Sequence, residues 1–277
     1  MTWWAIDVRT APERRERTSA WLVAHTGQAV EERDDGTLVT FAEDQPAATA
    51  LIAALAAAEG APVDAEPRPL EAVDWSTRWR DGLGSRRFGR LTVMPSWIAE
   101  AGRPDTSAVV LDPENAFGSG EHGSTRAALV LLERHVRLGD RVLDLGSGSG
   151  ILTIAAAKLG AARAVGIEND PEANLVALRN AERNAVRGRV EFLDGDAADL
   201  TRLLGPADLV LSNILRTVNV TLLSAIAAAL RPGGLGIFSG MEPAESALFR
   251  PELVAGGFMV RDEVEDAGWW AVAAVRP

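Results

Sequence analysis

The chain has 277 residues with 47% hydrophobic and 24% charged content, which is typical of a folded globular protein with one sizeable domain and room for a smaller one. It has no cysteine, which excludes disulfides and thiolate chemistry, and its three scattered histidines predict no metal site. The net charge of −11 argues against direct nucleic-acid binding and favours a basic partner, unless the excess acid only maintains solubility. Without a recognisable signal peptide or a bilayer-spanning apolar run, we expect a cytoplasmic protein with no membrane partner.

The first 70 residues predict a small α+β domain. The expected elements are a strand at 3–8, a helix at 12–25, strands at 29–33 and 37–42, a helix at 46–59 and a strand within 63–70. The turn signal Asp35-Gly36 joins the second and third strands as a hairpin. The order βαββαβ indicates a ferredoxin-like domain, for which we expect a binding or scaffolding role.

Residues 71–104 are interpreted as a linker. Asp74 is placed to cap a short helix in which Trp75 and Trp79, four residues apart, share a face. Packing is the favoured role for these tryptophans, with ligand binding as the alternative. Strands are expected at 90–94 and 108–111.

Residues 105–277 predict the larger domain, because strands and helices alternate there as in a parallel sheet covered on both faces. A short turn separates two further strands, 258–264 and 269–275, so this pair is antiparallel. The fold class is therefore α/β, with a Rossmann-like, mostly parallel seven-stranded sheet that ends in an antiparallel hairpin. The other expected strands are 141–145, 164–168, 190–193, 209–213 and 235–239, and the expected helices are 150–159, 171–184, 218–230 and 244–255.

A glycine-rich loop follows the first of these strands. Gly146, Gly148 and Gly150 allow a tight turn and a close approach of the backbone to a ligand. Their GxGxG spacing differs from the GxGxxG typical of nicotinamide-binding proteins. Asp144, two residues before the first glycine, also favours a methyltransferase and is counted with the cofactor-binding residues.

Acidic residues follow the next two strands. Glu168 ends its strand, where a carboxylate accepts hydrogen bonds from both ribose hydroxyls of a nucleoside. Asp196 has two open interpretations, an acceptor for the adenine amino group or part of an ordinary acidic loop. Glycine loop, Glu168 and terminal hairpin together predict S-adenosylmethionine as the cofactor.

Asn213 ends a strand on the sheet edge where ligands bind in open α/β folds. Because asparagine is disfavoured inside strands, the presence of Asn213 at this position requires an explanation. Its amide oxygen is suited to accept an N–H from an incoming amine and to direct the nitrogen lone pair at a methyl group. We therefore select Asn213 as the catalytic residue, with a strand-ending turn as the alternative.

A long glycine-rich loop at 112–125 precedes a helix that Ser124 or Thr125 is expected to cap. Phe117 within it suggests a cover over the ligand, so we count it as cofactor-binding. His122 is interpreted as structural, with a general base as the alternative.

These segments resemble the PrmA family, the methyltransferases of ribosomal protein L11. The resemblance rests on the loop 112–125, the loop 144–150, Asn213-Ile214 and Trp269-Trp270, with further similarity at Met94-Pro95-Ser96-Trp97. It implies cofactor contacts at Thr125, Gly146, Glu168 and Asn213. It also implies an N-terminal domain that grips the protein substrate and swings relative to the catalytic domain.

The chain departs from the family pattern at several positions. Glu114, Asn115 and Ser119 replace residues of the usual Asp-Pro-Gly-Leu-Ala-Phe-Gly-Thr-Gly segment, Glu168 replaces aspartate, and Ser212 replaces alanine. Glu114, and Arg216-Thr217 just after Asn213, lie where substrate would approach.

The resulting hypothesis is transfer of methyl groups from S-adenosylmethionine to lysine or N-terminal amines of a basic protein. The substrate that the resemblance implies is ribosomal protein L11 free of the ribosome, and we expect the enzyme to be a monomer. The alternatives are a methyltransferase for another protein or a small amine, a nicotinamide-dependent oxidoreductase and a non-catalytic binding module.

Overall fold

The structure is a computed structural model that describes residues 3–26, 30–33, 35–59, 63–69, 83–102, 105–114 and 116–277. The chain divides into two compact units, Met1–Arg78 and Trp79–Pro277. None of the helices in the described ranges is long and apolar enough to span a bilayer.

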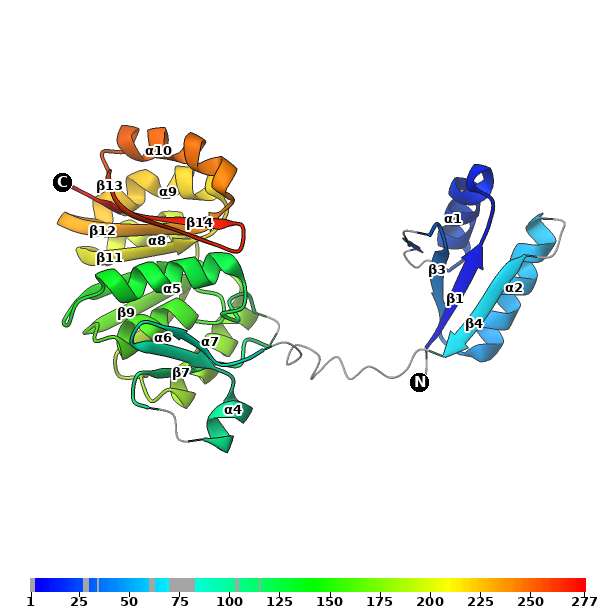
Figure 1. The fold of residues 1–277 in the computed structure, drawn as a ribbon, viewed down its shortest axis with the longest axis horizontal. Helices are drawn as coiled ribbons and strands as arrows, with labels where there is room; N and C mark the ends of the chain where they lie inside the picture. Colours follow the sequence, from blue (N-terminus) through cyan, green and yellow to red (C-terminus); the bar gives the residue numbers. More distant parts are fainter. Residues whose placement is uncertain are drawn as a thin grey trace. The chain divides into compact units, whose positions relative to one another are not determined.

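The N-terminal unit has the expected ferredoxin-like topology. Its strands follow the order β2-β3-β1-β4, and every neighbouring pair is antiparallel. Helices α1 and α2 contribute Leu22 and Leu55 to a core that also contains Ile6, Val8 and Leu38 of the sheet. The elements are β1 (Trp4–Arg9), α1 (Pro12–Thr26), β2 (Glu31–Glu32), β3 (Leu38–Ala42), α2 (Gln45–Glu59) and β4 (Asp64–Pro69) (Figure 1).

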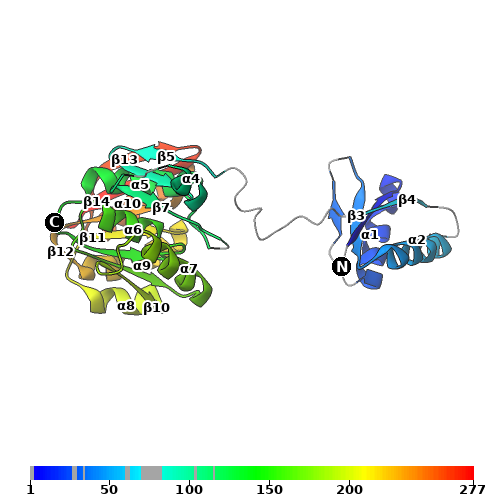
Figure 2. The same cartoon turned by 90° about the horizontal axis from the view of Figure 1, so that it is seen from below.

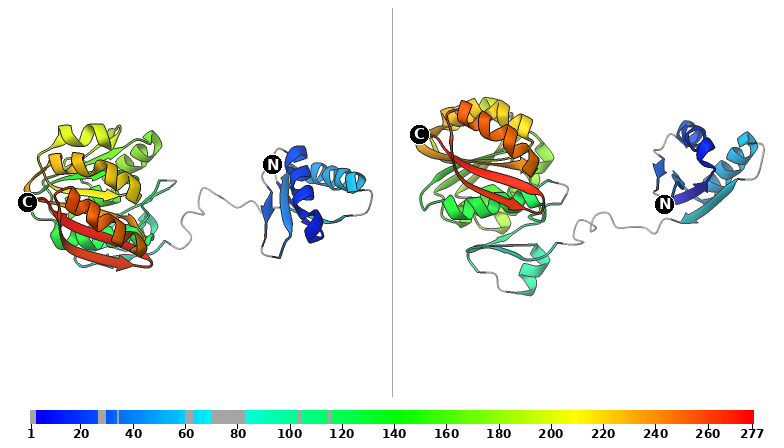
Figure 3. Two further views of the ribbon diagram at one scale, coloured as in Figure 1. Left: turned by 90° about the horizontal axis from the view of Figure 1, so that it is seen from above. Right: turned by 45° about the horizontal axis from the view of Figure 1, so that its top comes forward.

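The C-terminal unit contains the expected seven-stranded sheet, in the order β10-β9-β8-β11-β12-β14-β13. The first five strands are parallel, and β14 is antiparallel to both of its neighbours. The terminal hairpin, red in Figure 3, thus forms one edge of the sheet. The strands are β8 (Arg141–Leu145), β9 (Arg163–Glu168), β10 (Val190–Asp194), β11 (Ala207–Asn213), β12 (Leu230–Met241), β13 (Met259–Asp266) and β14 (Trp269–Val275).

Helices cover both faces of this sheet (Figures 1 and 2). One hydrophobic cluster joins α5, α6 and α7 to one face, and a second joins α8, α9 and α10 to the other. Burial on both sides explains why the central strands are almost continuously apolar, as in Leu209-Val210-Leu211. The helices are α5 (Gly123–His135), α6 (Ile151–Lys158), α7 (Pro171–Arg183), α8 (Ala197–Leu204), α9 (Arg216–Ala229) and α10 (Ser246–Ala255), with the short 3-10 helix η1 (Pro243–Glu245) before α10.

A small sheet of order β5-β6-β7 completes this unit. It comprises β5 (Arg86–Phe88), β6 (Leu91–Met94) and β7 (Ala108–Val110), with the short helix α4 (Ser96–Ala101) before β7. Strands β6 and β7 were expected, whereas β5 and α4 were not. The helix predicted around Asp74, Trp75 and Trp79 lies outside the described residues, and the predicted boundaries of the linker, 71 and 104, stay a prediction.

One local expectation was wrong, and one helix was not predicted. Helix α5 begins at Gly123, after His122, so neither Ser124 nor Thr125 caps it. Helix α8 was not expected, although Asp196 marks its start by accepting a hydrogen bond from the backbone N–H of Ala198 at 2.7 Å.

Candidate functional site

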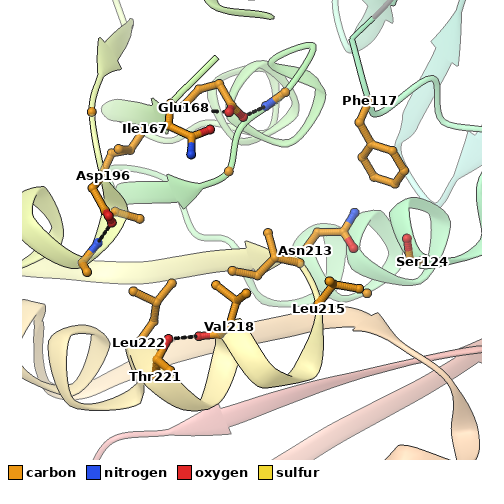
Figure 4. Close-up of a pocket in the computed structure, with 18 of the residues that line it drawn as sticks. Phe117, Ser124, Ile167, Glu168, Asp196, Asn213, Leu215, Val218, Thr221 and Leu222 are labelled. Carbon is orange, nitrogen blue, oxygen red and sulfur yellow. Dashed lines mark hydrogen bonds between the residues drawn. The ribbon is translucent and has the colours of Figure 1, made fainter.

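A cavity of about 720 Å³ opens at the carboxyl ends of the parallel strands. This is the edge where open α/β sheets bind ligands, and the volume suits a small molecule. Figure 4 shows Glu168 and Asp196 on one side of it, Phe117 and Ser124 on the other, and Asn213 between them. The predicted site residues that line the cavity are Phe117, Gly146, Gly148, Glu168, Asp196 and Asn213.

The glycine loop forms one wall. Gly148 has a φ of 51°, and a Cβ atom there would lie 2.5 Å from the carbonyl oxygen of Phe117. Gly150, with a φ of 81°, starts α6 and has Phe192 at 2.8 Å from an ideal Cβ. Only glycine fits such positions, because a side chain would meet both a disfavoured backbone angle and a steric clash. Gly146 and Gly148 face the cavity, whereas Gly150 supports the loop from behind.

Glu168 is held at the cavity by backbone amides. Its Oε2 accepts a hydrogen bond from the N–H of Gly148 at 2.9 Å. Its Oε1 accepts from Asn169 and Asp170 at 2.9 and 3.1 Å. These bonds fix the carboxylate at the rim. Oε1 already accepts two hydrogen bonds, whereas Oε2 accepts one and can accept another from a ligand hydroxyl.

Asp196 lines the cavity and also caps α8 through its Oδ1. The acidic residue is therefore part of a helix start rather than of an irregular loop. Its contact with adenine stays a prediction.

Asn213 ends β11 with its amide held from one side. Its Nδ2 donates to the hydroxyl of Thr125 at 3.3 Å, and Thr125 is fully buried behind the cavity wall. The Oδ1 of Asn213 is buried and has no hydrogen-bond partner in the described part of the chain. A buried amide oxygen without a partner is costly, and Asn213 lines the cavity, so a turn of its side chain would let this oxygen accept from a ligand N–H.

A buried network fixes the strand end that carries Asn213. Asn219 of α9 accepts from the hydroxyl of Ser212 at 2.6 Å and donates to the carbonyls of Ile214 and Ser239 at 3.0 and 3.1 Å. The network thereby ties β11 to α9 and β12, so the position of Asn213 is determined by packed elements rather than by a free loop.

Asp144 lies behind the glycine loop and does not line the cavity. Its Oδ2 accepts from the hydroxyl of Thr153 at 2.6 Å, whereas Oδ1 lacks a partner among the described residues. Burial raises the pKa of Asp144 to about 7, against the opposing effect of the Thr153 donors. Its direct contact with a cofactor stays a prediction.

Three rings line the cavity beside Asn213. We call Phe117, His122 and Trp269 the aromatic wall. The ring centroid of His122 lies 4.3 Å from that of Trp269 and 5.4 Å from that of Phe117. Its Nδ1 also shares a hydrogen bond of 2.7 Å with the hydroxyl of Ser124, so packing and this bond hold the histidine in place.

Apolar residues at the start of α9 line the opposite wall and were not identified from the sequence. Leu215 and Val218 are exposed and line the cavity together with Leu222. Their spacing of three and four residues places them on one helix face, which was a usable signal. The sequence alone does not distinguish them from the other apolar residues of α9, such as Leu223 and Ile226, which pack on the sheet.

Two charged departures from the family pattern form ion pairs within the chain. Glu114, with a left-handed φ of 50°, contacts Arg179 at 2.6 Å. Arg216 contacts Glu245 at 3.3 Å. Both charges therefore have partners, while Asn115 lies outside the described residues.

Comparison with known proteins identifies the family. The family model described as ribosomal protein L11 methyltransferase (PrmA) matches residues 28–277. The chain belongs to the PrmA family. A ribosomal protein L11 methyltransferase from Pseudomonas paraeruginosa is 34% identical over all of this chain and 99% of its own length. One from Pelotomaculum thermopropionicum is 41% identical over 75% of this chain and 67% of its own length.

A solved PrmA-family structure shows the same fold. The crystal structure of the ribosomal protein L11 methylase from Lactobacillus delbrueckii subsp. bulgaricus matches with a TM-score of 0.63 and 28% identity. The match covers 70% of this chain and 98% of that one. The predicted α/β fold class is confirmed, and the family favours methyl transfer over the oxidoreductase and binding-module alternatives.

This chain is thus a methyltransferase that uses S-adenosylmethionine. Its cavity fits that cofactor in two respects: its volume suits a small molecule, and the fixed carboxylate of Glu168 at the rim can still accept from a ribose hydroxyl.

Proposed function

We propose that this chain methylates amino groups of ribosomal protein L11, namely lysine side chains, the N-terminal α-amine or both. The relatives named above are L11 methyltransferases, which supports this substrate. The observation that carries the choice of an amine is the buried, unpaired Oδ1 of Asn213 at the cavity. An amine is a hydrogen-bond donor that also has a nucleophilic lone pair once it is neutral.

We divide the cavity into a donor end, which binds the methyl donor, and an acceptor end, which receives the substrate amine. The donor end comprises Gly146, Gly148, Glu168 and Asp196. We assign these residues to the nucleoside of the cofactor and to the cofactor groups that face the backbone of the glycine loop. The acceptor end comprises Asn213 and the aromatic wall, where the amine enters and where Phe117 covers the bound cofactor. Thr125 acts through Asn213, and Gly150 and Asp144 act by shaping the glycine loop.

The chain's contribution to the reaction is alignment and desolvation. S-adenosylmethionine supplies a sulfonium methyl group that is already activated for transfer. Lysine has a solution pKa of about 10.4, so the ammonium must release a proton to solvent before the amine is nucleophilic. The aromatic wall and Leu215 disfavour the charged ammonium by excluding water. Asn213 then accepts one N–H and directs the lone pair.

The N-terminal unit is proposed to recognise L11. Its ferredoxin-like fold is a compact unit with a hydrophobic core of its own, which supports a separate role in protein binding. The chain's charge of −11 would favour encounter with a basic substrate.

Incubation with methyl-labelled S-adenosylmethionine and a mixture of purified ribosomal proteins tests the proposal. Label on L11, mapped by peptide mass spectrometry to amine nitrogens, is the expected result. Label on a different ribosomal protein alone would replace L11 as the substrate, and label on oxygen or guanidinium groups would contradict amine methylation.

A further inference from the structure

Asn180 of α7 is a fully buried polar residue that does not line the cavity. Its side chain bonds to one segment from the donor end of the cavity and to one from the acceptor end. Its Oδ1 accepts from the backbone N–H of Asp112 at 3.1 Å, and its Nδ2 donates to the Asp112 carbonyl at 3.1 Å. The same Nδ2 donates to the carbonyl of Ser149, in the glycine loop, at 3.0 Å. One amide therefore joins the start of the Phe117-bearing loop to the loop at the donor end.

Ser149 continues this connection on the other side. Its N–H donates to the carbonyl of Phe117 at 2.9 Å, and its hydroxyl donates to the carbonyl of Gly118 at 2.6 Å. The two loops thus contact each other directly at Ser149 and are both held from behind by Asn180. Arg183 reinforces the arrangement, since it donates to Asn180 at 2.8 Å and pairs with Asp112 at 3.0 Å.

We propose that Asn180 is a positioning residue that holds the Phe117 loop and the glycine loop in one fixed arrangement, so that both ends of the cavity are preformed. The inference rests on the proposed function, because it assigns Phe117 to the acceptor end and the glycine loop to the cofactor. Preformed cavity walls lower the conformational entropy that is lost when a ligand binds. They also keep the reacting groups aligned, and small displacements of such groups lower kcat strongly.

Asn184, one helical turn later, provides a matched control. It is also buried, and its amide accepts from the N–H of Val110 at 2.8 Å and donates to the Val110 carbonyl at 2.6 Å. It thus makes the same kind of bonds to β7. Its Nδ2 also donates to the backbone carbonyl of Asn180 at 2.8 Å, which Asn180→Ala retains, and within the described residues its side chain makes no bond to the glycine loop. Asn180→Ala and Asn184→Ala should therefore destabilise the fold similarly and differ only in their effect on the cavity.

The experiment compares these two variants in the full-length chain. Hydrogen exchange is measured without cofactor at the N–H of Ser149, which bonds to Phe117 and not to Asn180. Binding of S-adenosylhomocysteine is measured by calorimetry, and kcat and KM are measured with L11. We expect Asn180→Ala to accelerate exchange at Ser149, to weaken binding about tenfold and to lower kcat about tenfold or more. Asn184→Ala should leave all three within about threefold of wild type.

Equal effects of the two substitutions, or wild-type exchange at Ser149 in Asn180→Ala, would overturn the inference. If Asn180→Ala does not fold, Asn180→Asp decides, because it keeps the acceptor for the Asp112 N–H and removes the donor to the Ser149 carbonyl. Lower kcat with faster exchange at Ser149 supports the proposal, and wild-type values contradict it. Failure of the wild-type chain to methylate L11 would refute the proposed function instead, and the exchange comparison would still stand.

Discussion

The two ends of the cavity differ in how their polar groups are satisfied. At the donor end, both oxygens of Glu168 accept backbone hydrogen bonds, and Asp196 is bonded to the start of α8. At the acceptor end, Asn213 has its amide nitrogen bonded to Thr125, and its oxygen has no partner in the described structure. The donor end is thus organised before any ligand binds, whereas the acceptor end carries an unmet hydrogen-bonding need that a substrate amine would satisfy.

The largest expected effect comes from Asn213→Ala. The substitution removes the acceptor that orients the amine, so kcat should fall about 100-fold or more while the affinity for S-adenosylhomocysteine stays within about threefold. Steady-state kinetics and calorimetry check the two quantities separately. Thr125→Ser, which keeps the hydroxyl that holds Nδ2, is the control and should retain most activity. Equal losses in kcat and cofactor affinity would remove the distinction between the two ends.

Glu168→Gln should produce the opposite pattern. The new NH₂ group faces backbone N–H donors and cannot accept from both sides, so S-adenosylmethionine affinity should fall about tenfold or more. At saturating cofactor, kcat should change less. Calorimetry measures the affinity, with Glu182→Gln, an exposed change on α7, as the control. Unchanged affinity would show that the donor end does not depend on this carboxylate.

Asp144, behind the glycine loop, is expected to make the folding stability of the chain depend on pH. Its pKa is raised to about 7 in the folded chain, chiefly by burial, above the value of about 3.9 in an unfolded chain. Because the folded state favours the protonated form, the stabilisation is present at low pH and is lost progressively as pH rises from about 4 to about 7. Asp144→Asn should remove this dependence, gaining about 2 kcal/mol relative to wild type between pH 5 and pH 8. Denaturant unfolding at both pH values measures it, and parallel pH profiles would contradict the assignment.

Glu114 should give the smallest effect. Glycine relieves the left-handed φ of 50° but forfeits the ion pair with Arg179, so Glu114→Gly should stay within about 1 kcal/mol of wild type. Glu114→Val cannot adopt this angle easily and should destabilise by a further ~1 kcal/mol or more. Thermal unfolding compares the two variants. Equal melting temperatures would show that backbone strain at Glu114 does not matter.

Much of the fold followed from sequence patterns with a clear physical cause. Alternating strands and helices indicated the parallel sheet, and the short turn between 264 and 269 indicated the antiparallel hairpin. Helix α8 was missed because its eight residues are short, and Asp196 was interpreted as a ligand or a loop residue rather than a cap. Strand β5 was missed because Arg86-Arg87-Phe88 has one buried residue and no alternating pattern.

The site residues were predictable where they lie at the carboxyl end of a strand that borders the cavity, as Glu168 and Asn213 do. Thr125 was selected by resemblance, but its hydrogen bond to Asn213 joins residues 88 positions apart and has no local signal. The same holds for Asn180, whose bonds to Asp112 and Ser149 exist only after α7 packs against both loops. Side chains that act through distant backbone groups therefore required the structure.

The most direct test is peptide mass spectrometry of purified L11 after incubation with saturating S-adenosylmethionine and either the wild-type chain or Asn213→Ala. The account predicts methyl groups on amine nitrogens with the wild-type enzyme and far fewer with the variant, although both bind the cofactor. An unmodified L11 with the wild-type enzyme, or equal methylation by both proteins, would contradict it.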